Sequence, residues 1–429
     1  MALTEQELQI EEKMRKAFWQ RAKGLSGLHE SAKPTPKISN AGGEIELFLF
    51  QENGALATDE QKYRVLEQSN AGVELGAAAV EIHPSPVDLQ KDGFDGWLHQ
   101  LREEQTLVVL AAKAQSLFVG RSGTIPWVPL QKVERTNEEK YQLVPAFHDR
   151  HRSLLSPMKV GNTRLHSASE VGGINSFQFS IQAVDAPDAV DKLQRMFLVS
   201  PFVSALSSNS RILAGNDSGW ADTRFEIWRQ THDTRTARDR KMGKTVRVGL
   251  PQKHPETLHE YLEEVSSHPF ILDKPKFALE VGIGLSWRDA RIKIIEDKYV
   301  VEFRPISTQP TIEEDLALAA FSIGRILWSQ KQNEQMPNIN TLHQNKIAAE
   351  KFGIHSKFLT NDGLRVPIPQ ILLTEISHAE TALKDSHIFD ETAKTGLEIL
   401  RKRVISGITP DQKLRRLSPS QLIESVKIL

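Results

Sequence analysis

The first 50 residues change from a helical to a strand-like pattern of apolar positions. Apolar residues recur at roughly helical spacing over residues 4–22, which predicts a helix. The polar stretch that follows, SAKPTPKISNAGG, contains two prolines and is typical of a linker. In the next stretch, GGEIELFLF, isoleucine and leucine alternate with Glu44 and Glu46, which predicts a strand with one apolar face.

The remaining pattern mixes helices and strands without a regular alternation of the two. It predicts helices over 58–80, within 86–118, over 138–155, from Pro187 to about Ser208, and over most of the chain after Thr311. It predicts strands in the segments TLVVLAA, SFQFSIQAV, FALEVGIG, RIKIIED and KYVVEFRP. Residues 209–250 are expected to be rich in loops. This order favours an α+β fold over a doubly wound parallel sheet.

Charge and composition narrow the class of protein. The chain has 429 residues with 54 basic and 55 acidic side chains, so no global field attracts a polyanion and nucleic acid is not an expected partner. Cysteine is absent, which excludes disulfides and thiol catalysis. The N-terminus is polar, and no apolar run is long enough to span a bilayer, so we expect a cytoplasmic protein without a membrane partner.

Three glutamates are the first candidates for chemistry. Glu44 and Glu46 are two apart on one predicted strand, so their carboxylates share a face, and a divalent cation would offset their repulsion. The alternative is a solvent-facing strand edge. Glu81 follows the uncharged run GAAAV, and Glu74 lies two turns earlier on the predicted helix. Here the alternative is a pair of surface glutamates.

Two further segments combine acidic and basic side chains. Glu302 and Arg304 are also two apart on a predicted strand, where they suit a metal carboxylate beside a phosphate-binding guanidinium. A simple local ion pair is the alternative. Residues 224–247 contain eight basic residues against three acidic ones, which indicates a local anion site or else a solvated basic loop.

A series of segments in this order resembles the bacterial and plant-type glutamate–cysteine ligases and the related carboxylate–amine ligases. The series spans roughly residues 40–360. The segments are GGEIELFLF, ELGAAAVEIHPSP, SFQFSIQAVD, the long stretch from VDKLQRMF to DTRFEIW, WRDAR, VVEFRP and QPTIEEDLALAA. Each is a weak signal alone, and the shared order is what makes the resemblance specific.

The resemblance implies a glutamine synthetase-like fold, with a curved antiparallel sheet that forms an active-site funnel and helices outside it. It implies an N-terminal helix and linker over 1–40, a catalytic domain over 41–330, and a mainly helical C-terminal region over 331–429 packed on that domain. The implied reaction is ATP-dependent amide formation through an acyl phosphate, with Mg²⁺ as the metal and Mn²⁺ as an alternative.

The resemblance also implies a role for each matching residue. The implied set is Glu44, Glu46, Glu81 and Glu302 as metal ligands, Arg304 facing the transferred phosphate, Gln178 and Arg235 toward ATP, and Arg224 and Arg291 toward the acid substrate. The implied partners are ATP, a small amino-acid-like carboxylate and an amine, and a homo-oligomer is left open.

Departures from the family pattern concern the substrates. The central strand carries Gln178 and Ser180 where relatives have other polar residues, and the basic loop reads HDTRTAR. An amine other than cysteine is therefore expected. A degenerate relative that binds a nucleotide or amino acid without catalysis is the alternative, as is a scaffold protein, but four retained metal carboxylates argue for a ligase.

Overall fold

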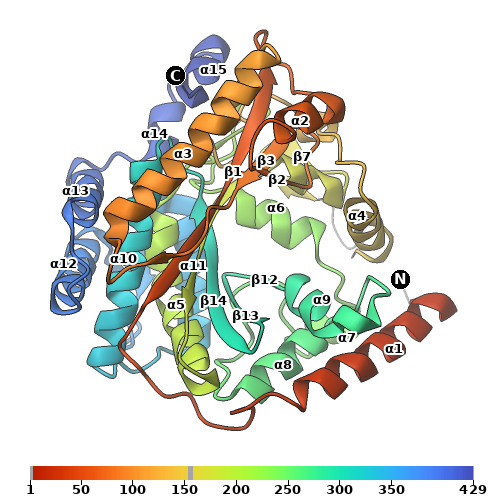
Figure 1. The fold of residues 1–429 in the computed structure, drawn as a ribbon, viewed down its shortest axis with the longest axis vertical. Coiled ribbons are helices and arrows are strands. Elements are labelled where there is room, and N and C mark those ends of the chain that lie inside the picture. The colour runs from red at the N-terminus through yellow and green to blue at the C-terminus, as the bar shows by residue number, and fades with distance from the viewer. Residues whose placement is uncertain (1–2, 153–157, 429) are drawn as a thin grey trace.

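An antiparallel sheet of eight strands runs through the molecule (Figure 1). The structure is a computed structural model, and it describes residues 3–152 and 158–428. The strand order is β13-β14-β8-β1-β3-β2, and β4 and β5 also pair with β1. The strands are β1 (Asn40–Gln51), β2 (Gly72–Val73), β3 (Ala79–Ile82), β4 (Val87–Asp88), β5 (Leu117–Gly120), β8 (Ser176–Gln182), β13 (Ala290–Ile295) and β14 (Lys298–Ser307). The long β1 therefore connects most of the sheet.

Four small strand pairs lie outside this sheet. They are β6 (Lys159–Val160) with β7 (Thr163–Arg164), β9 (Ile212–Leu213) with β10 (Asn216–Asp217), β11 (Val248–Gly249) with β12 (Trp287–Arg288), and β15 (Lys357–Leu359) with β16 (Arg365–Pro367). The β11–β12 pair is parallel and contributes to the candidate site described below.

Helices account for most of the remaining described residues. The α-helices are α1 (Glu5–Ala22), α2 (Asp59–Leu66), α3 (Gly93–Ala114), α4 (Glu139–His151), α5 (Ala186–Leu206), α6 (Arg224–Thr231), α7 (Ala237–Lys241), α8 (Leu258–Ser266), α9 (Ala278–Gly284), α10 (Ile312–Lys331), α11 (Ile339–Phe352), α12 (Pro369–Asp385), α13 (Glu391–Ser406), α14 (Pro410–Leu414) and α15 (Pro419–Val426). Short 3₁₀ helices are η1 (Leu130–Lys132), η2 (Ala168–Gly173), η3 (Pro275–Phe277) and η4 (Gly353–His355).

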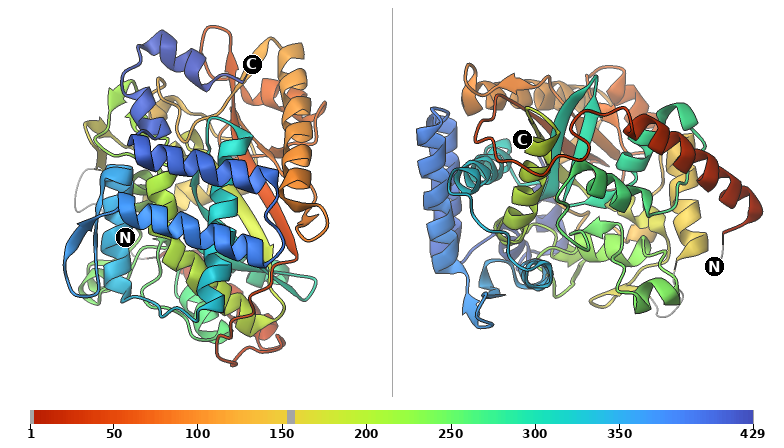
Figure 2. Two further views of the ribbon diagram at one scale, coloured as in Figure 1. Left: turned by 90° about the vertical axis from the view of Figure 1, so that its left-hand side faces the viewer. Right: turned by 90° about the horizontal axis from the view of Figure 1, so that it is seen from below.

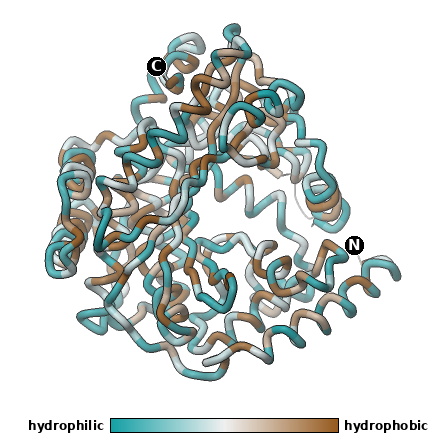
Figure 3. Tube along the Cα trace, in the orientation of Figure 1, coloured by the Kyte–Doolittle hydropathy of each residue, from teal (hydrophilic) through white to brown (hydrophobic). Residues whose placement is uncertain are grey.

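One face of the sheet is apolar and is covered by helices. Phe177, Phe179, Ile181, Val301 and Phe303 are all buried there, and α3, α5 and α10 pack behind the strands. Helices α12 and α13 pack in turn on α10, as the outer layer in Figure 2. Apolar residues gather along the sheet and these inner helices, whereas the outer helices are largely hydrophilic (Figure 3). The opposite face is left for polar side chains.

This architecture confirms the predicted α+β class and the curved antiparallel sheet of the glutamine synthetase-like fold, with helices outside. The helices expected near the N-terminus, after Pro187 and after Thr311 are present as α1, α5 and α10 to α15. The strands expected from GGEIELFLF, SFQFSIQAV, RIKIIED and KYVVEFRP are β1, β8, β13 and β14. The helix expected over 138–155 is α4, although residues 153–155 lie outside the described part of the chain.

The helix predicted over residues 58–80 is wrong beyond its first turns. Helix α2 ends at Leu66, and Glu81 lies on strand β3, where it pairs with Glu46. A Cβ at Gly76 would lie 2.3 Å from the carbonyl oxygen of Gly172, so the backbone needs glycine to pass this point. The small alanines that suggested a helix are buried around this crossing instead.

Two predicted strands are helical. The segment TLVVLAA belongs to α3, where Val108, Ala111 and Ala112 are buried and Leu107 and Leu110 are exposed. That spacing fits a helix with one buried face. The segment FALEVGIG forms α9, which lies against α1.

The predicted division at residues 40 and 330 stays a prediction. Strand β1 begins at Asn40, and the C-terminal helices pack on α10. Buried residues from all three predicted segments belong to one continuous hydrophobic core.

Candidate active site

Strand register collects polar side chains on the open face of the sheet. Residues directly opposite each other in an antiparallel pair point to the same face. Glu46 pairs with Glu81, Glu44 pairs with Gln178, and Glu302 pairs with both Ser180 and Arg291. Five neighbouring strands thus direct their polar side chains toward one side, which sequence spacing had shown only within single strands.

Glu46, Glu74 and Glu81 form a compact carboxylate cluster. One oxygen from each lies within 4.8 Å of the others, which makes them a group of described residues able to hold a metal ion. Burial, with the nearby charge of Glu74, raises the pKa of Glu46 to about 8. Burial, with the nearby charges of Glu74, Glu44 and Glu46, also raises the pKa of Glu81 well above its usual range. The crowding disfavours three negative charges, and a divalent cation would remove that penalty.

Neutral groups hold one carboxylate of this cluster in place. Gln178 donates its Nε2 to Glu46 at 2.8 Å, and the backbone N–H of Ser176 donates to the other oxygen at 2.6 Å. The Oε1 of Gln178 is buried without a hydrogen-bond partner among the described residues. The donor set is therefore carboxylate oxygens with an unsatisfied amide oxygen beside them, which suits a hard cation such as Mg²⁺.

Glu302 has a different environment from the other glutamates. Its carboxylate forms ion pairs with Arg291 and Lys293, and with Arg304 at 2.7 Å. Burial alone would raise the pKa of Glu302, but the three cations hold it well below its usual range. Lys293 also reaches Glu44 at 3.3 Å. Glu302 thus anchors a group of cationic side chains.

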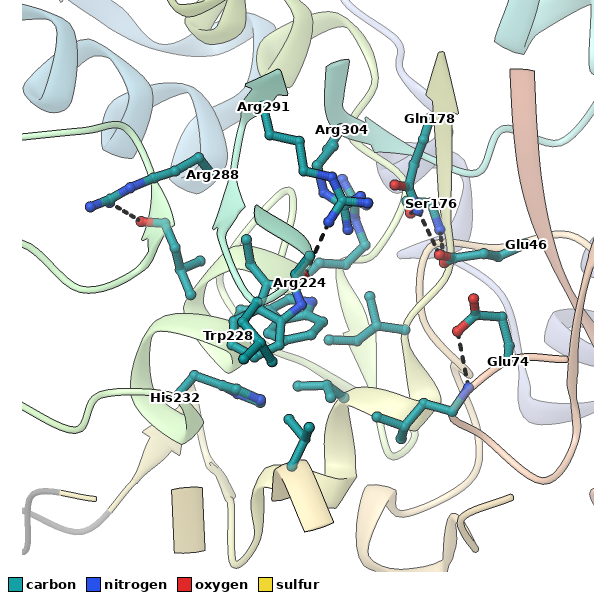
Figure 4. A pocket seen from close by; sticks show the side chains of 18 of the residues that line it. Glu46, Glu74, Ser176, Gln178, Arg224, Trp228, His232, Arg288, Arg291 and Arg304 are labelled. Atoms are coloured by element: carbon teal, nitrogen blue, oxygen red, sulfur yellow. Dashed lines mark hydrogen bonds between the residues drawn. The ribbon is translucent and has the colours of Figure 1, made fainter. Parts of the chain in front are cut away.

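A cavity of about 450 Å³ lies over this face of the sheet. Glu44, Glu46, Glu74 and Glu81 line it, as do Gln178, Arg224, Arg291 and Arg304. Glu302 is not among the lining residues, because it lies behind the cations that it binds. Figure 4 shows Arg291 and Arg304 between the glutamates on one side and Trp228 and His232 on the other.

The two arginines predicted to hold the acid substrate lie in different settings. The Arg224 guanidinium donates to Asp222 and to the carbonyls of Ile306 and Pro305, so its described bonds are all within the protein. Arg291 donates to Glu302 and, at 3.1 Å, to the carbonyl of Gly284. Substrate binding by either residue stays a prediction, and Arg291 has the more open position.

Arg235 lies away from the carboxylate cluster. Its guanidinium forms a two-nitrogen pair with Asp233, at 2.9 and 3.0 Å. It lines a neighbouring cavity of about 200 Å³ that shares His232 with the main one. Its predicted role toward ATP is untested, as is that of Gln178, which contacts Glu46.

Sequence reasoning missed three residues of the cavity and its surroundings. Glu74 was noted only as a helical neighbour of Glu81, whereas it joins the cluster from the turn between β2 and β3. Lys293 points to the same face as Arg291, two positions away on β13, and that spacing was a usable signal. Trp228 lines the cavity from α6, whereas the nearby Trp220 is not among the lining residues. No local pattern distinguished these two tryptophans.

Comparisons with known proteins agree with this geometry. The chain belongs to the Glutamate-cysteine ligase family 2 (GCS2), whose sequence model matches residues 40–427. It is therefore an ATP-dependent ligase of the glutamate–cysteine ligase-like kind, which confirms the resemblance of its segments. No curated protein sequence matches the chain significantly.

Solved structures support the fold. The glutamate–cysteine ligase of Francisella tularensis, solved in complex with AMP, is similar with a TM-score of 0.58 and 12% identity, over 92% of this chain and 88% of that one. A bifunctional glutathione synthetase from Pasteurella multocida gives a TM-score of 0.53 and 9% identity, over 98% of this chain and 53% of that longer one. At such identities the similarity establishes the fold alone.

Membrane insertion has no candidate segment in the part of the chain that the structure describes. None of the helices there combines the length and the apolar character that crossing a bilayer requires.

Proposed function

We propose that this ligase activates a small carboxylate as an acyl phosphate and transfers the acyl group to an amine, with Mg²⁺ or Mn²⁺ as the metal. The observation that carries the proposal is the carboxylate cluster facing a pair of guanidinium groups across one cavity. Phosphoryl transfer needs charge neutralisation and alignment more than covalent participation by the protein. The arrangement supplies both.

The atoms balance in two steps. A carboxylate oxygen of the acid attacks the γ-phosphorus of ATP, the bond from that phosphorus to the bridging oxygen breaks, and ADP leaves with the electron pair. The amine nitrogen then attacks the acyl carbon, the carbon–oxygen bond to phosphate breaks, and inorganic phosphate leaves. The proton lost by nitrogen goes to solvent.

The glutamates divide between two roles in this proposal. Glu46, Glu74 and Glu81 would hold the metal, with Glu44 at the edge of the same cavity. When bound, the metal supplies positive charge that neutralises the phosphate oxygens. Glu302, proposed from the sequence as a further ligand, holds the basic side chains in place in this geometry.

The basic side chains act on the acid and the transferred phosphoryl group. Arg304 gives one nitrogen to Glu302 and borders the cavity, so its guanidinium can face the negative charge that develops on the phosphate. Arg291 lies beside it on the same carboxylate and can pair with the acid substrate. Glu302 keeps both guanidinium groups oriented, which limits the reorganisation that the reaction requires.

The proposal is tested by ADP release from the full chain with Mg²⁺, a panel of amino acids as acids, and a panel of amines. We expect release that requires both an acid and an amine, and a product mass equal to their amide. Arg304→Lys keeps the charge but loses the planar fork, and we expect kcat to fall by about 100-fold. ADP release that does not respond to acid or amine would refute the proposal.

A further inference from the structure

The cavity has two chemically different ends. The glutamates occupy one end, and the other is lined by apolar side chains from four separate segments (Figure 4). These are Val144 of α4, Trp228 of α6, Val248 of β11, and Leu285 and Trp287 at the junction of α9 and β12. We refer to these five residues as the apolar wall. Such a surface inside a charged funnel is not required by phosphoryl transfer.

Aromatic rings make up the centre of the apolar wall. The indole rings of Trp228 and Trp287 lie 5.1 Å apart, and the His232 imidazole lies 4.5 Å from the first and 4.8 Å from the second. His148 packs on Trp287 from behind, at 5.4 Å. Burial, with Arg247 nearby, lowers the pKa of His148 to about 3, and burial lowers that of His232 as well. Both imidazoles are therefore neutral near pH 7.

The apolar wall is held in position by contacts outside the cavity. The Arg288 guanidinium donates to the carbonyls of Val248 and Leu250 and to Glu264, which fixes strands β11 and β12. Arg288 also lines the cavity, and its charge is paired with Glu264. A charged substituent that packs on the apolar wall would lose its hydration without gaining a partner from those five residues.

Arg291 lies at the boundary between the two ends. One of its nitrogens reaches the carbonyl of Gly284, next to Leu285, while the others pair with Glu302. A carboxylate bound by Arg291 and Arg304 would therefore have the carboxylate cluster on one side and the apolar wall on the other. A substrate whose carboxylate binds Arg291 and Arg304 would place the rest of the molecule against the indole rings.

We propose that the acid substrate of this ligase carries an aromatic or branched aliphatic side chain, which packs on Trp228 and Trp287. The inference rests on the proposed function, because it assumes that the substrate's carboxylate is activated beside the carboxylate cluster of Glu46, Glu74 and Glu81. It places the side chain of glutamate, which is itself charged, at a disadvantage. It also explains why the wall combines two indoles with aliphatic residues.

The nucleotide base is a weaker candidate for the same surface. A purine has ring nitrogens and an amino group that need hydrogen-bond partners when they are buried. The side chains of Val144, Val248 and Leu285 offer none, and the two indoles offer one N–H donor each and no acceptor, whereas a hydrocarbon side chain needs no partner. Binding of the nucleotide base on this surface is an outcome that would overturn the proposal.

The test uses hydroxylamine in place of the unknown amine, so that the acid alone is varied. The full chain is incubated with ATP, Mg²⁺ and either glutamate, aspartate, phenylalanine, leucine or 3-phenylpropanoate, and hydroxamate and ADP are both measured. We expect kcat/KM to be about tenfold or more higher for the best apolar acid than for glutamate. Higher kcat/KM for the charged acids, with turnover intact, would overturn the inference and leave the proposed function standing.

Variants of the wall locate the side chain. We expect Trp228→Ala and Trp287→Ala to raise KM for the apolar acid by about 10- to 100-fold, and Trp228→Leu to recover part of the loss. The matched control is Trp328→Ala, because Trp328 stacks on His378 at 4.4 Å and does not line the cavity. A rise in KM for ATP with an unchanged KM for the acid would assign the wall to the base. Absence of ADP release with every acid would instead refute the proposed function.

Discussion

Replacing Glu46 by glutamine should separate the stability of the fold from its capacity to bind a metal. The Glu46 carboxylate is crowded by Glu74 and Glu81, and burial together with Glu74 raises its pKa to about 8. Each pKa unit corresponds to about 1.4 kcal/mol. At pH 7 the folded protein therefore holds this group mostly protonated, and because its usual pKa is 4.5, this proton uptake costs the metal-free fold about 3 kcal/mol.

The amide removes the charge but not the shape. Its oxygen can accept the N–H of Ser176, and its nitrogen can donate to the Oε1 of Gln178, which has no partner among the described residues. That exchange requires the Gln178 amide to turn over, and we allow about 1 kcal/mol for the weaker hydrogen bonds. The net expectation is a gain of about 2 kcal/mol in the free energy of unfolding.

Thermal unfolding in a chelator measures the gain. The unfolding entropy of a chain of this length is about 0.9 kcal/mol/K, so Tm should rise by about 2 °C. Added Mg²⁺ with ATP should raise Tm of the natural protein but not that of Glu46→Gln, whose turnover should also fall. Glu52→Gln, in the exposed turn beyond β1, is the control and should change neither value. A lower Tm in chelator with an undiminished response to Mg²⁺ would refute the reasoning.

Two other perturbations test the electrostatics around the cavity. His148 has its pKa lowered to about 3 by burial, so the unfolded chain takes up a proton below about pH 6.5 that the folded one excludes, and stability is lost as the pH falls. His148→Gln should remove about 2 kcal/mol from the loss of stability that urea unfolding shows between pH 7 and pH 5, and His99→Gln, on the exposed side of α3, should not change that loss. Glu302→Gln removes the partner of three cations and should destabilise the fold by about 3–5 kcal/mol, and calorimetry should show weaker Mg²⁺-dependent ATP binding. Glu280→Gln breaks an exposed pair and should cost under about 1 kcal/mol; equal losses in the two variants would contradict the assigned role of Glu302.

Relations within one strand could be predicted from the sequence. Side chains alternate with a period of two, so the shared faces of Glu44 with Glu46 and of Glu302 with Arg304 needed only the recognition of a strand. The order of the segments likewise indicated the family and its fold before any contact was known. Register between strands is different, because the pairing of Glu46 with Glu81 depends on a crossing that Gly76 permits.

Errors arose where a short apolar run fits both a helix and a strand. The alanines before Glu81 have high helix propensity, but their small size serves a buried crossing. The apolar wall could not be predicted from the sequence for another reason. Trp228, Val248 and Trp287 come from three segments, and only the fold brings them together. Its aromatic character was visible in the sequence, but its position beside Arg291 was not.

The contrast between Glu302 and Glu46 shows how one sheet face supports opposite electrostatic tasks. Three cations stabilise the charge of Glu302, so that carboxylate holds the guanidinium groups of Arg291 and Arg304 in place without a metal. Glu46 receives hydrogen bonds from neutral groups and faces two other carboxylates, so a proton or a bound cation would offset its charge. On our proposal, exchanging these roles would leave the arginines without their carboxylate partner and the metal without one of its ligands. The arrangement therefore keeps a fixed positive group and an open negative one on either side of the place where we propose that phosphate is transferred.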